Sequence, residues 1–169
     1  MFRALLFSAV LFSLPAYARL GETLDECVAR YGDVVERKPS VIPGSDPDVC
    51  LFTKSGITIV AEFKAGKAWK ILYRMASMDN AAVQTLLTAE ATDDGWSSPI
   101  KMGNQEVRLS DDHDRIAIRQ LTRRPEDVAT LTFVTKAFAA ANRKDYETKL
   151  ALISDEVKRR EEARPLKGL

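Results

Sequence analysis

The sequence is typical of an α+β protein, in which helices pack on one face of an antiparallel sheet. Apolar and polar residues alternate over 57–75, which is the pattern of two half-buried strands joined as a hairpin. Helical segments precede each of two groups of strand-like segments, so a helix-then-strands plan occurs twice, and the charged end of the chain predicts a long C-terminal helix. One domain is expected, because 169 residues lie within the usual range for a single core.

The start of the chain has the pattern of a secretory signal peptide. Arg3 gives a positive start, residues 4–14 form an apolar run broken only by serines, and Ala16-Tyr17-Ala18 is a small-residue cleavage pattern. The run is shorter than the roughly 20 apolar residues that span a bilayer, so we expect cleavage after Ala18 and no stable membrane span afterwards. The expected location is periplasmic or secreted.

Three parts of the chain follow from these patterns. We assign a signal peptide to 1–18, an α+β domain to 19–141, and a charged C-terminal helix and tail to 142–169. Once Arg3 is removed, basic and acidic residues are equal in number, so the net charge gives no sign of nucleic-acid binding. An envelope or secreted protein is the expected partner.

A short first helix is expected over 23–31. Thr23 and Glu26 form a capping box, and Gly32 supplies a stop. The helix is followed by a possible irregular strand at 33–38 and by a loop rich in proline at 39–48.

The two cysteines are expected to pair. Cys27 lies on the first helix and Cys50 on a strand-like segment at 49–54. An oxidising compartment permits a bond between them, which would join helix to sheet. The alternative is two separately buried thiols, because free cysteine behaves as a small apolar residue.

Strand register decides the turn of the 57–75 hairpin. A two-residue Ala65-Gly66 loop would turn the two apolar rows to opposite faces of the sheet. A three-residue loop at 64–66 places both rows on one face, with Gly66 left-handed and with Trp69 and Tyr73 buried together. We therefore expect the three-residue loop. The opposite row of the hairpin carries its polar side chains: Thr58, Glu62, Lys70 and Arg74.

The second half follows the same plan without a residue-level repeat. Asp79 is the expected N-cap of a helix that ends before 93–95, and a connection at 96–103 contains Trp96, which either caps the core or serves as an exposed anchor. An antiparallel meander is expected from three further strands, at 105–110, 115–121 and 129–135.

The C-terminal helix has a narrow apolar stripe amid dense charge, and this stripe needs a surface in the domain's own sheet or in another protein. The stripe consists of Tyr146, Leu150, Ile153 and Val157.

Short motifs near the start resemble a known group of exported bacterial domains. Leu20-Gly21-Glu22-Thr23, followed by Cys27-Val28 and Tyr31-Gly32, resembles the opening of β-lactamase-inhibitor-like and outer-membrane small-protein-A domains, and of a broad set of secreted proteins with the same plan. The hairpin at 63–73, with Gly66-Lys67, is similar to the strands that follow in such domains. The resemblance implies a non-enzymatic scaffold that binds other proteins, and it assigns no site residues. The lipidation cysteine of the small-protein-A group is absent here.

Residues that could support catalysis are few. The only histidine lies in Asp111-Asp112-His113-Asp114, whose oxygens and imidazole could hold a cation, but its place between two strands predicts a polar turn. A shared groove for Glu62 and Glu106 would permit carboxylate chemistry. No nucleophile-elbow or phosphate-binding glycine motif occurs. We therefore predict no catalytic residue, no metal site and no cofactor.

The predicted function is an exported, non-catalytic binding or interaction module of unknown ligand. The alternative is a periplasmic hydrolase or metal-dependent enzyme that uses an acidic groove near His113. The candidate binding residues are Trp96, Glu62, Lys70 and Arg74.

Overall fold

The computed structural model describes residues 19–91, 95–122, 124, 127–142 and 144–163, with backbone alone for 144–150 and 161. The predicted signal peptide at 1–18 lies outside the described residues and stays a prediction.

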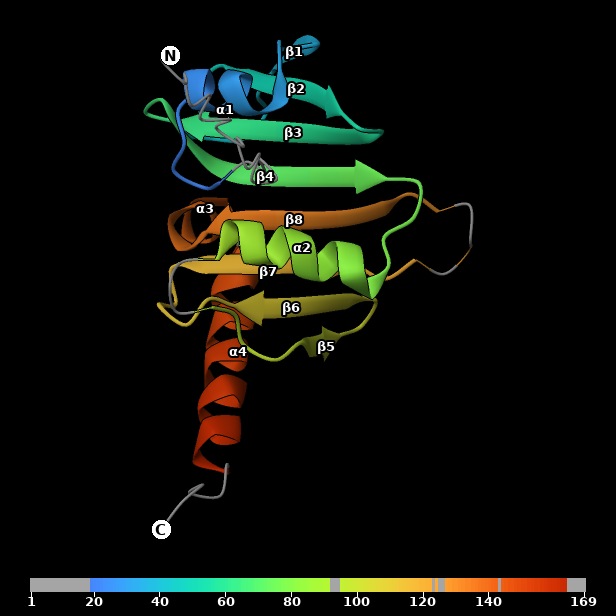
Figure 1. Cartoon of the computed structure of the whole chain (residues 1–169). Coiled ribbons are helices and arrows are strands. Elements are labelled where there is room, and N and C mark those ends of the chain that lie inside the picture. Colours follow the sequence, from blue (N-terminus) through green and yellow to red (C-terminus); the bar gives the residue numbers. More distant parts are fainter. Residues whose placement is uncertain (1–18, 92–94, 123, 125–126, 143, 164–169) are drawn as a thin grey trace, which may run out of the picture.

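The described residues form one eight-stranded antiparallel sheet, in the order β1-β2-β3-β4-β8-β7-β6-β5. The first group of strands comprises β1 (Glu36–Pro39), β2 (Asp48–Lys54), β3 (Ile57–Lys64) and β4 (Lys67–Met75). The second comprises β5 (Ile100–Met102), β6 (Gln105–Leu109), β7 (Arg115–Gln120) and β8 (Ala129–Thr135). The two groups meet where β4 pairs with β8, at the middle of the sheet (Figure 1). The α+β class is thereby confirmed.

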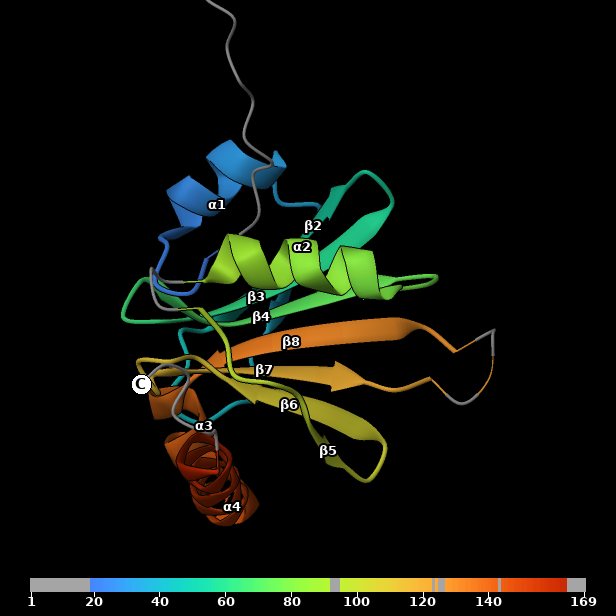
Figure 2. The same cartoon turned by 60° about the horizontal axis from the view of Figure 1, so that its bottom comes forward.

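Helices cover both faces of this sheet, so the expectation that they pack on one face is wrong. The helices are α1 (Leu24–Tyr31), α2 (Asn80–Glu90), α3 (Lys136–Asn142) and α4 (Lys144–Glu162). Figure 2 shows α1 and α2 on one side of the sheet, here called the α1/α2 face, and α3 and α4 on the other, the α3/α4 face.

Strand β7 gives the physical reason for this two-sided cover. Its consecutive residues Ile116, Ala117 and Ile118 are all buried, and consecutive strand residues point to opposite faces. Ala117 joins the cluster beneath α1 and α2, whereas Ile116 and Ile118 join the cluster beneath α3 and α4. A strand that is apolar on both sides needs a covering layer on each.

The predicted helix starts are confirmed. The Thr23 hydroxyl accepts a hydrogen bond from Glu26 N, and the Glu26 carboxylate accepts one from Thr23 N at 2.7 Å, which completes the capping box. The helix ends at Gly32, whose φ of 91° favours glycine. Asp79 caps α2 by accepting a hydrogen bond from Ala82 N at 2.7 Å.

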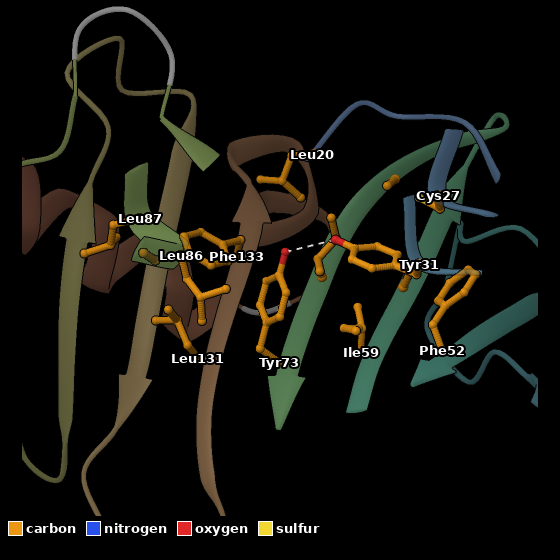
Figure 3. Close-up of a cluster of buried hydrophobic side chains, with 14 of the residues drawn as sticks. Leu20, Cys27, Tyr31, Phe52, Ile59, Tyr73, Leu86, Leu87, Leu131 and Phe133 are labelled. Atoms are coloured by element: carbon orange, nitrogen blue, oxygen red, sulfur yellow. Dashed lines mark hydrogen bonds between the residues drawn. The ribbon is translucent and has the colours of Figure 1, made fainter. Parts of the chain in front are cut away.

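The cluster beneath α1 and α2 is the larger of the two and is built around aromatic side chains (Figure 3). Tyr31 of α1 packs on Phe52 of β2, with ring centroids 5.5 Å apart. Tyr73 of β4 meets Phe133 of β8 edge to face, with centroids 5.9 Å apart. These contacts join both groups of strands to one core.

The β3–β4 hairpin has the two-residue turn that register seemed to forbid. Ala65 and Gly66 have φ of 50° and 73°, which is typical of the tight turn that joins twisted strands. Phe63 pairs with Ala68, and Lys64 pairs with Lys67. The predicted three-residue loop at 64–66 is therefore wrong.

A β-bulge reconciles this turn with a buried apolar row. Glu62 pairs with Lys70, so Trp69 is an extra residue in β4. Trp69 packs in the cluster beneath α3 and α4, whereas Ile71 and Tyr73 pack beneath α1 and α2. The expectation that Trp69 and Tyr73 share a face is wrong, because the bulge resets the alternation between them.

The chain contains two elements that the sequence reasoning missed. Strand β5 lies inside the segment 96–103, which was expected to be a connection, and helix α3 directly follows β8. Both are short, and a three-residue strand leaves almost no periodic signal.

Helix α4 packs on its own domain. Ile153 and Val157 are buried against the same cluster as Val107 and Leu109 of β6, and Arg160 donates a hydrogen bond to Pro99 O at 3.3 Å. The side chains of Tyr146 and Leu150 lie outside the described residues. The described part of the stripe thus faces the sheet.

The expected disulfide is not formed, so that prediction is corrected to two free, buried thiols. Cys27 and Cys50 both belong to the cluster beneath α1 and α2, where each packs as a small apolar residue. Burial raises the pKa of Cys27 to about 12 and also raises the pKa of Cys50. Both side chains therefore stay protonated thiols at neutral pH.

We expect Ile153→Ala to destabilise the protein by about 2–4 kcal/mol, the usual cost of truncating a buried aliphatic side chain. The adjacent Leu152, which is 58% exposed, supplies the control, and Leu152→Ala should change stability by less than about 0.5 kcal/mol. Urea unfolding of both variants measures the difference. Equal stability in the two would contradict the packing of α4 on the sheet.

We expect both thiols to react with a thiol reagent only after unfolding, because a buried, protonated thiol is a poor nucleophile. Reagent added to the native protein and then to protein in guanidinium chloride should give no fast reaction and then two equivalents of reaction. The melting temperature should be the same with and without reductant. A lower melting temperature with reductant would show that the disulfide is formed after all.

Candidate functional site

The candidate site lies on the part of the α3/α4 face that the helices leave open. Strand register aligns the side chains of this face in three rows that cross the sheet. The inner row, nearest α3, consists of Val49, Glu62, Lys70, Val134 and Ile116. The aliphatic row consists of Leu51, Val60, Leu72, Thr132, Ile118 and Val107. The polar row consists of Thr53, Thr58, Arg74, Thr130, Gln120 and Gln105.

A groove of about 450 Å³ occupies this face between β4 and β6. Its floor takes residues from all three rows, and its walls are residues 41–43 of the β1–β2 connection and two side chains of α3, Phe138 and Asn142. A volume of this size is within the range of small-ligand and peptide sites.

The wall at 41–43 is held in place by the hairpin turn. The Asp46 carboxylate accepts hydrogen bonds from Ala65 N at 2.9 Å and Gly66 N at 2.8 Å, and Asp46 N donates to Phe63 O at 2.7 Å. Ile42 packs against the cluster beneath α3 and α4. These contacts therefore fix the β1–β2 connection to the sheet.

A partly buried ion pair lies at the α3 end of the groove. Lys70 Nζ is 2.5 Å from Glu62 Oε1, and Glu62 is only 5% exposed. The ammonium also lies 5.5 Å from the centre of the Phe138 ring. Burying two charges is costly, so such a pair contributes little net stability, whereas removing one partner is strongly destabilising.

Several buried side-chain polar atoms have no hydrogen-bond partner among the described residues. They come from the β1–β2 connection, β3, β4 and the end of α3: Ser45 Oγ, Glu62 Oε2, Trp69 Nε1 and Asn142 Oδ1. Buried polar groups in folded proteins nearly always have partners. Of these residues, Asn142 lines the groove.

The polar row makes the outer margin of the groove. Gln105 Nε2 donates to Gln120 Oε1 at 3.1 Å, and Thr130 lies between Gln120 and Arg74 in the register. Arg74 is exposed, and no carboxylate among the described residues forms an ion pair with it. This margin offers hydroxyl, amide and guanidinium groups to solvent.

The structure separates the predicted binding residues. Glu62, Lys70 and Arg74 lie on the groove face, as the alternation of the hairpin predicts. Trp96 lies on the other face, where its ring packs on Phe133 with centroids 5.6 Å apart and its Nε1 donates to Leu87 O at 2.8 Å. Trp96 is thus part of the core cover.

Sequence reasoning missed the groove residues of β7 and β8. The alternation of Thr130 and Thr132 with Leu131 and Phe133 was a usable signal, because it places two hydroxyls on the face opposite the core. Asn142 at the end of α3 has no comparable pattern.

His113 belongs to a polar turn. Its φ is 61°, its N–H donates to Ser110 O at 2.8 Å, and the Asp112 carboxylate accepts hydrogen bonds from the Ser110 hydroxyl and from Asp114 N. In the described part of the chain, there is no group of three or more His, Cys, Asp or Glu side chains that could hold a metal ion.

The alternative of an acidic groove near His113 stays a prediction. The cavity beside His113, of about 200 Å³, is lined by Leu109, Lys136 and two residues of α4 and holds no carboxylate. Glu106 pairs with Arg119 at 3.4 Å, and Arg119 in turn donates to Met78 O, which lies just before α2. Glu106 therefore lies on the α1/α2 face, opposite Glu62.

Glu90 is a second titratable group in an unusual setting, within the core beneath α1 and α2. Burial raises the pKa of Glu90 to about 8. Hydrogen bonds from Leu20 N at 3.1 Å and from the Tyr73 hydroxyl at 3.3 Å, together with the charge of Arg115, lower this pKa but offset only part of the effect of burial. Tyr73 is in turn 3.2 Å from the Tyr31 hydroxyl (Figure 3). This network ties the N-terminal segment, α1 and α2 together, which is a structural role.

No known protein family and no curated protein matches this chain. Among solved structures, a cysteine-rich secretory protein from Staphylococcus aureus subsp. aureus Mu50 is 12% identical, with a TM-score of 0.44 over 72% of this chain and 44% of that one. An extracellular protein containing a SCP domain from Bacillus anthracis str. Ames is 10% identical, with a TM-score of 0.44 over 72% and 46%.

The chain spans less than half the length of these two proteins. Likeness this weak carries no argument about function. The resemblance to β-lactamase-inhibitor-like and small-protein-A domains stays a prediction.

We expect Glu90 to make the protein less stable as pH rises from about 5 to about 8. Its pKa is raised on folding from 4.5, so the folded state holds the proton more tightly than the unfolded state does. The favourable contribution is complete below pH 4.5 and is lost as pH passes through 8. Glu90→Gln should flatten this part of the profile of melting temperature against pH.

Glu162→Gln, at an exposed site on α4, is the matched control and should leave the profile unchanged. An identical profile for the wild-type and Glu90→Gln proteins would show that Glu90 is already ionised in the fold.

Proposed function

We propose that the protein is an exported, non-catalytic binding module and that the groove on the α3/α4 face holds its ligand. The observation that supports this most strongly is the composition of the groove. Half-exposed Leu72 and Thr132 lie at its floor, uncharged amides and hydroxyls line its margin, and Asn142 at its closed end has a side-chain oxygen without a hydrogen-bond partner among the described residues. A cleft that combines apolar contact with convergent polar groups is suited to binding a ligand.

A non-catalytic role is supported by the titratable groups of the groove. Lys70 is the one titratable side chain among the described lining residues, and it already forms an ion pair with Glu62. General acid–base and nucleophilic mechanisms need a second group within hydrogen-bond reach of the first. The groove offers hydrogen bonds and apolar contact, which suit binding.

The edges of the sheet are less suited to binding than its face. Edge strand β1 is exposed along its length and carries Glu36, Arg37, Lys38 and Pro39, and the other edge, β5, is three residues long. Charge, proline and shortness are the features by which proteins prevent strand addition at an edge. A partner is therefore expected on the groove face.

Export is proposed from the pattern of residues 1–18, and the location that follows is periplasmic or secreted. Leaving aside the gaps in 19–163, the helices are too short or too polar to form a membrane span. A secreted or envelope protein is the proposed partner.

We also propose that the two groups of strands are variants of one helix-then-strands unit. The order α1, β1–β4 and then α2, β5–β8 supports this, with the long helix α4 added after the second unit. The groove then lies across the junction of the units, where β4 pairs with β8.

We expect Thr132→Arg to weaken ligand binding at least tenfold, because a long side chain at the centre of the floor fills the groove. Thr85→Arg, at an exposed position on α2, makes the same substitution on the other face and should leave binding unchanged. Immobilised wild-type protein would capture molecules from the secreted and envelope fractions of its organism. Each captured molecule would then be purified and titrated against all three proteins by calorimetry.

The proposal predicts a ligand that Thr132→Arg releases, that Thr85→Arg retains, and that is recovered chemically unchanged. Equal binding to wild type and Thr132→Arg would contradict the assignment of the groove. Conversion of the ligand into a product would contradict the non-catalytic role.

A further inference from the structure

We propose that the groove binds an extended peptide segment that carries an acidic side chain beside Arg74. This inference rests on the proposed function and adds the chemical class of the ligand. It depends on three features of the α3/α4 face: the spacing of its rows, the hydrogen-bonding character of its polar atoms, and its charge.

The rows fit a short extended chain. Neighbouring strands lie about 4.8 Å apart, so the three steps from β4 to β6 give a groove floor roughly 14 Å long. An extended peptide rises about 3.3 Å per residue, which places about four residues over this length. The aliphatic row, with Leu72 and Ile118, provides apolar contact for side chains, while the adjacent polar row provides hydrogen bonds for the backbone.

The polar groups match peptide amides. Threonine hydroxyls and glutamine side chains both donate and accept hydrogen bonds, as backbone N–H and C=O groups together require. Asn142, which lines the groove at the end of α3, adds an acceptor, because its Oδ1 has no hydrogen-bond partner among the described residues. A ligand with amide groups offers the donors and acceptors that these side chains require.

The aromatic rings argue against a stacked sugar. Trp69 and Phe138 are 4% and 6% exposed and pack edge to face with centroids 5.0 Å apart. Lys64 Nζ lies over the Trp69 ring at 4.7 Å, and Lys70 Nζ lies over the Phe138 ring at 5.5 Å. The ring faces at this end of the groove are therefore already occupied.

Charge complementarity selects an acidic peptide. The lining contains no carboxylate, and the nearby Glu62 is committed to Lys70. Arg74 is an exposed cation in the polar row, outside the groove lining but paired in register with the lining residue Thr130, and it has no ion-pair partner among the described residues. A glutamate or aspartate of the ligand pairs with Arg74, whereas a lysine at the same place is repelled.

A random heptapeptide display library supplies the probe. Selection on the wild-type protein, with counter-selection on Thr132→Arg, should enrich peptides that have alternating aliphatic residues next to Asp or Glu. Three synthetic versions of the best peptide, with Glu, Gln or Lys at the acidic position, should bind with affinities that fall about fivefold at each step. This modest step is typical of an exposed ion pair and should shrink as salt is added.

Arg74→Glu should reverse the order so that the Lys peptide binds best. Lys101→Glu makes the same charge change on edge strand β5, outside the groove lining, and should leave the order unchanged. Thermal melts of both variants check that each is folded, which is expected because both side chains are exposed.

Several outcomes would overturn the inference separately from the proposed function. Equal affinity for the Glu, Gln and Lys peptides, with no effect of Arg74→Glu, would remove the acidic requirement. Failure to enrich any peptide, together with capture of an oligosaccharide or small molecule that Thr132→Arg releases, would remove the peptide class and leave the groove as the site. Peptides that bind wild type and Thr132→Arg equally would overturn the groove as well.

Discussion

The fold depends on strand β4, which joins the two groups of strands and faces a different environment on each side. It pairs with β3 on one edge and with β8 on the other. The bulge at Trp69 allows Ala68 and Ile71 to point toward α1 and α2 while Trp69 and Lys70 both point toward the α3/α4 face. Without the extra residue, the strand after the turn would place its apolar row on the wrong face, because a one-residue slip exchanges the two faces.

The groove follows from the way the two faces are covered. On the α1/α2 face, two helices and the N-terminal segment close over one large cluster, which even encloses the carboxyl group of Glu90. On the other face, α3 and α4 cover one end of the second group of strands, and the β1–β2 connection lies at the turn end of the β3–β4 hairpin. The space left between these covers is the groove, and the ion pair of Glu62 and Lys70 lies at its closed end.

Local signals in the sequence predicted local structure well. The capping box at Thr23, the N-cap at Asp79 and the existence of the strands of the 57–75 hairpin depend only on near neighbours, and each matches the structure. Glu62, Lys70 and Arg74 were found in the same way, as the polar side of a hairpin. The α+β class follows from these elements together.

Features that depend on distant contacts could not be predicted in this way. The bulge is needed only because β8 and two layers of helices specify the faces of β4, and none of these is visible in the hairpin itself. The disulfide was inferred from the oxidising compartment that export implies, whereas the fold buries Cys27 and Cys50 as separate thiols. Trp96 lies in a segment without periodicity, and its contact with Phe133 brings together residues far apart in the chain.

The most direct test of the account is methyl and amide NMR of the isotope-labelled protein, titrated with the ligand that it retains. The account predicts shifts at the groove, in the methyl groups of Leu72, Ile118 and Val134 and in the amides near Gln120, with the methyl groups of Leu86 and Leu131 on the other face unchanged. Shifts concentrated on Leu86 and Leu131, with the groove signals unmoved, would contradict it.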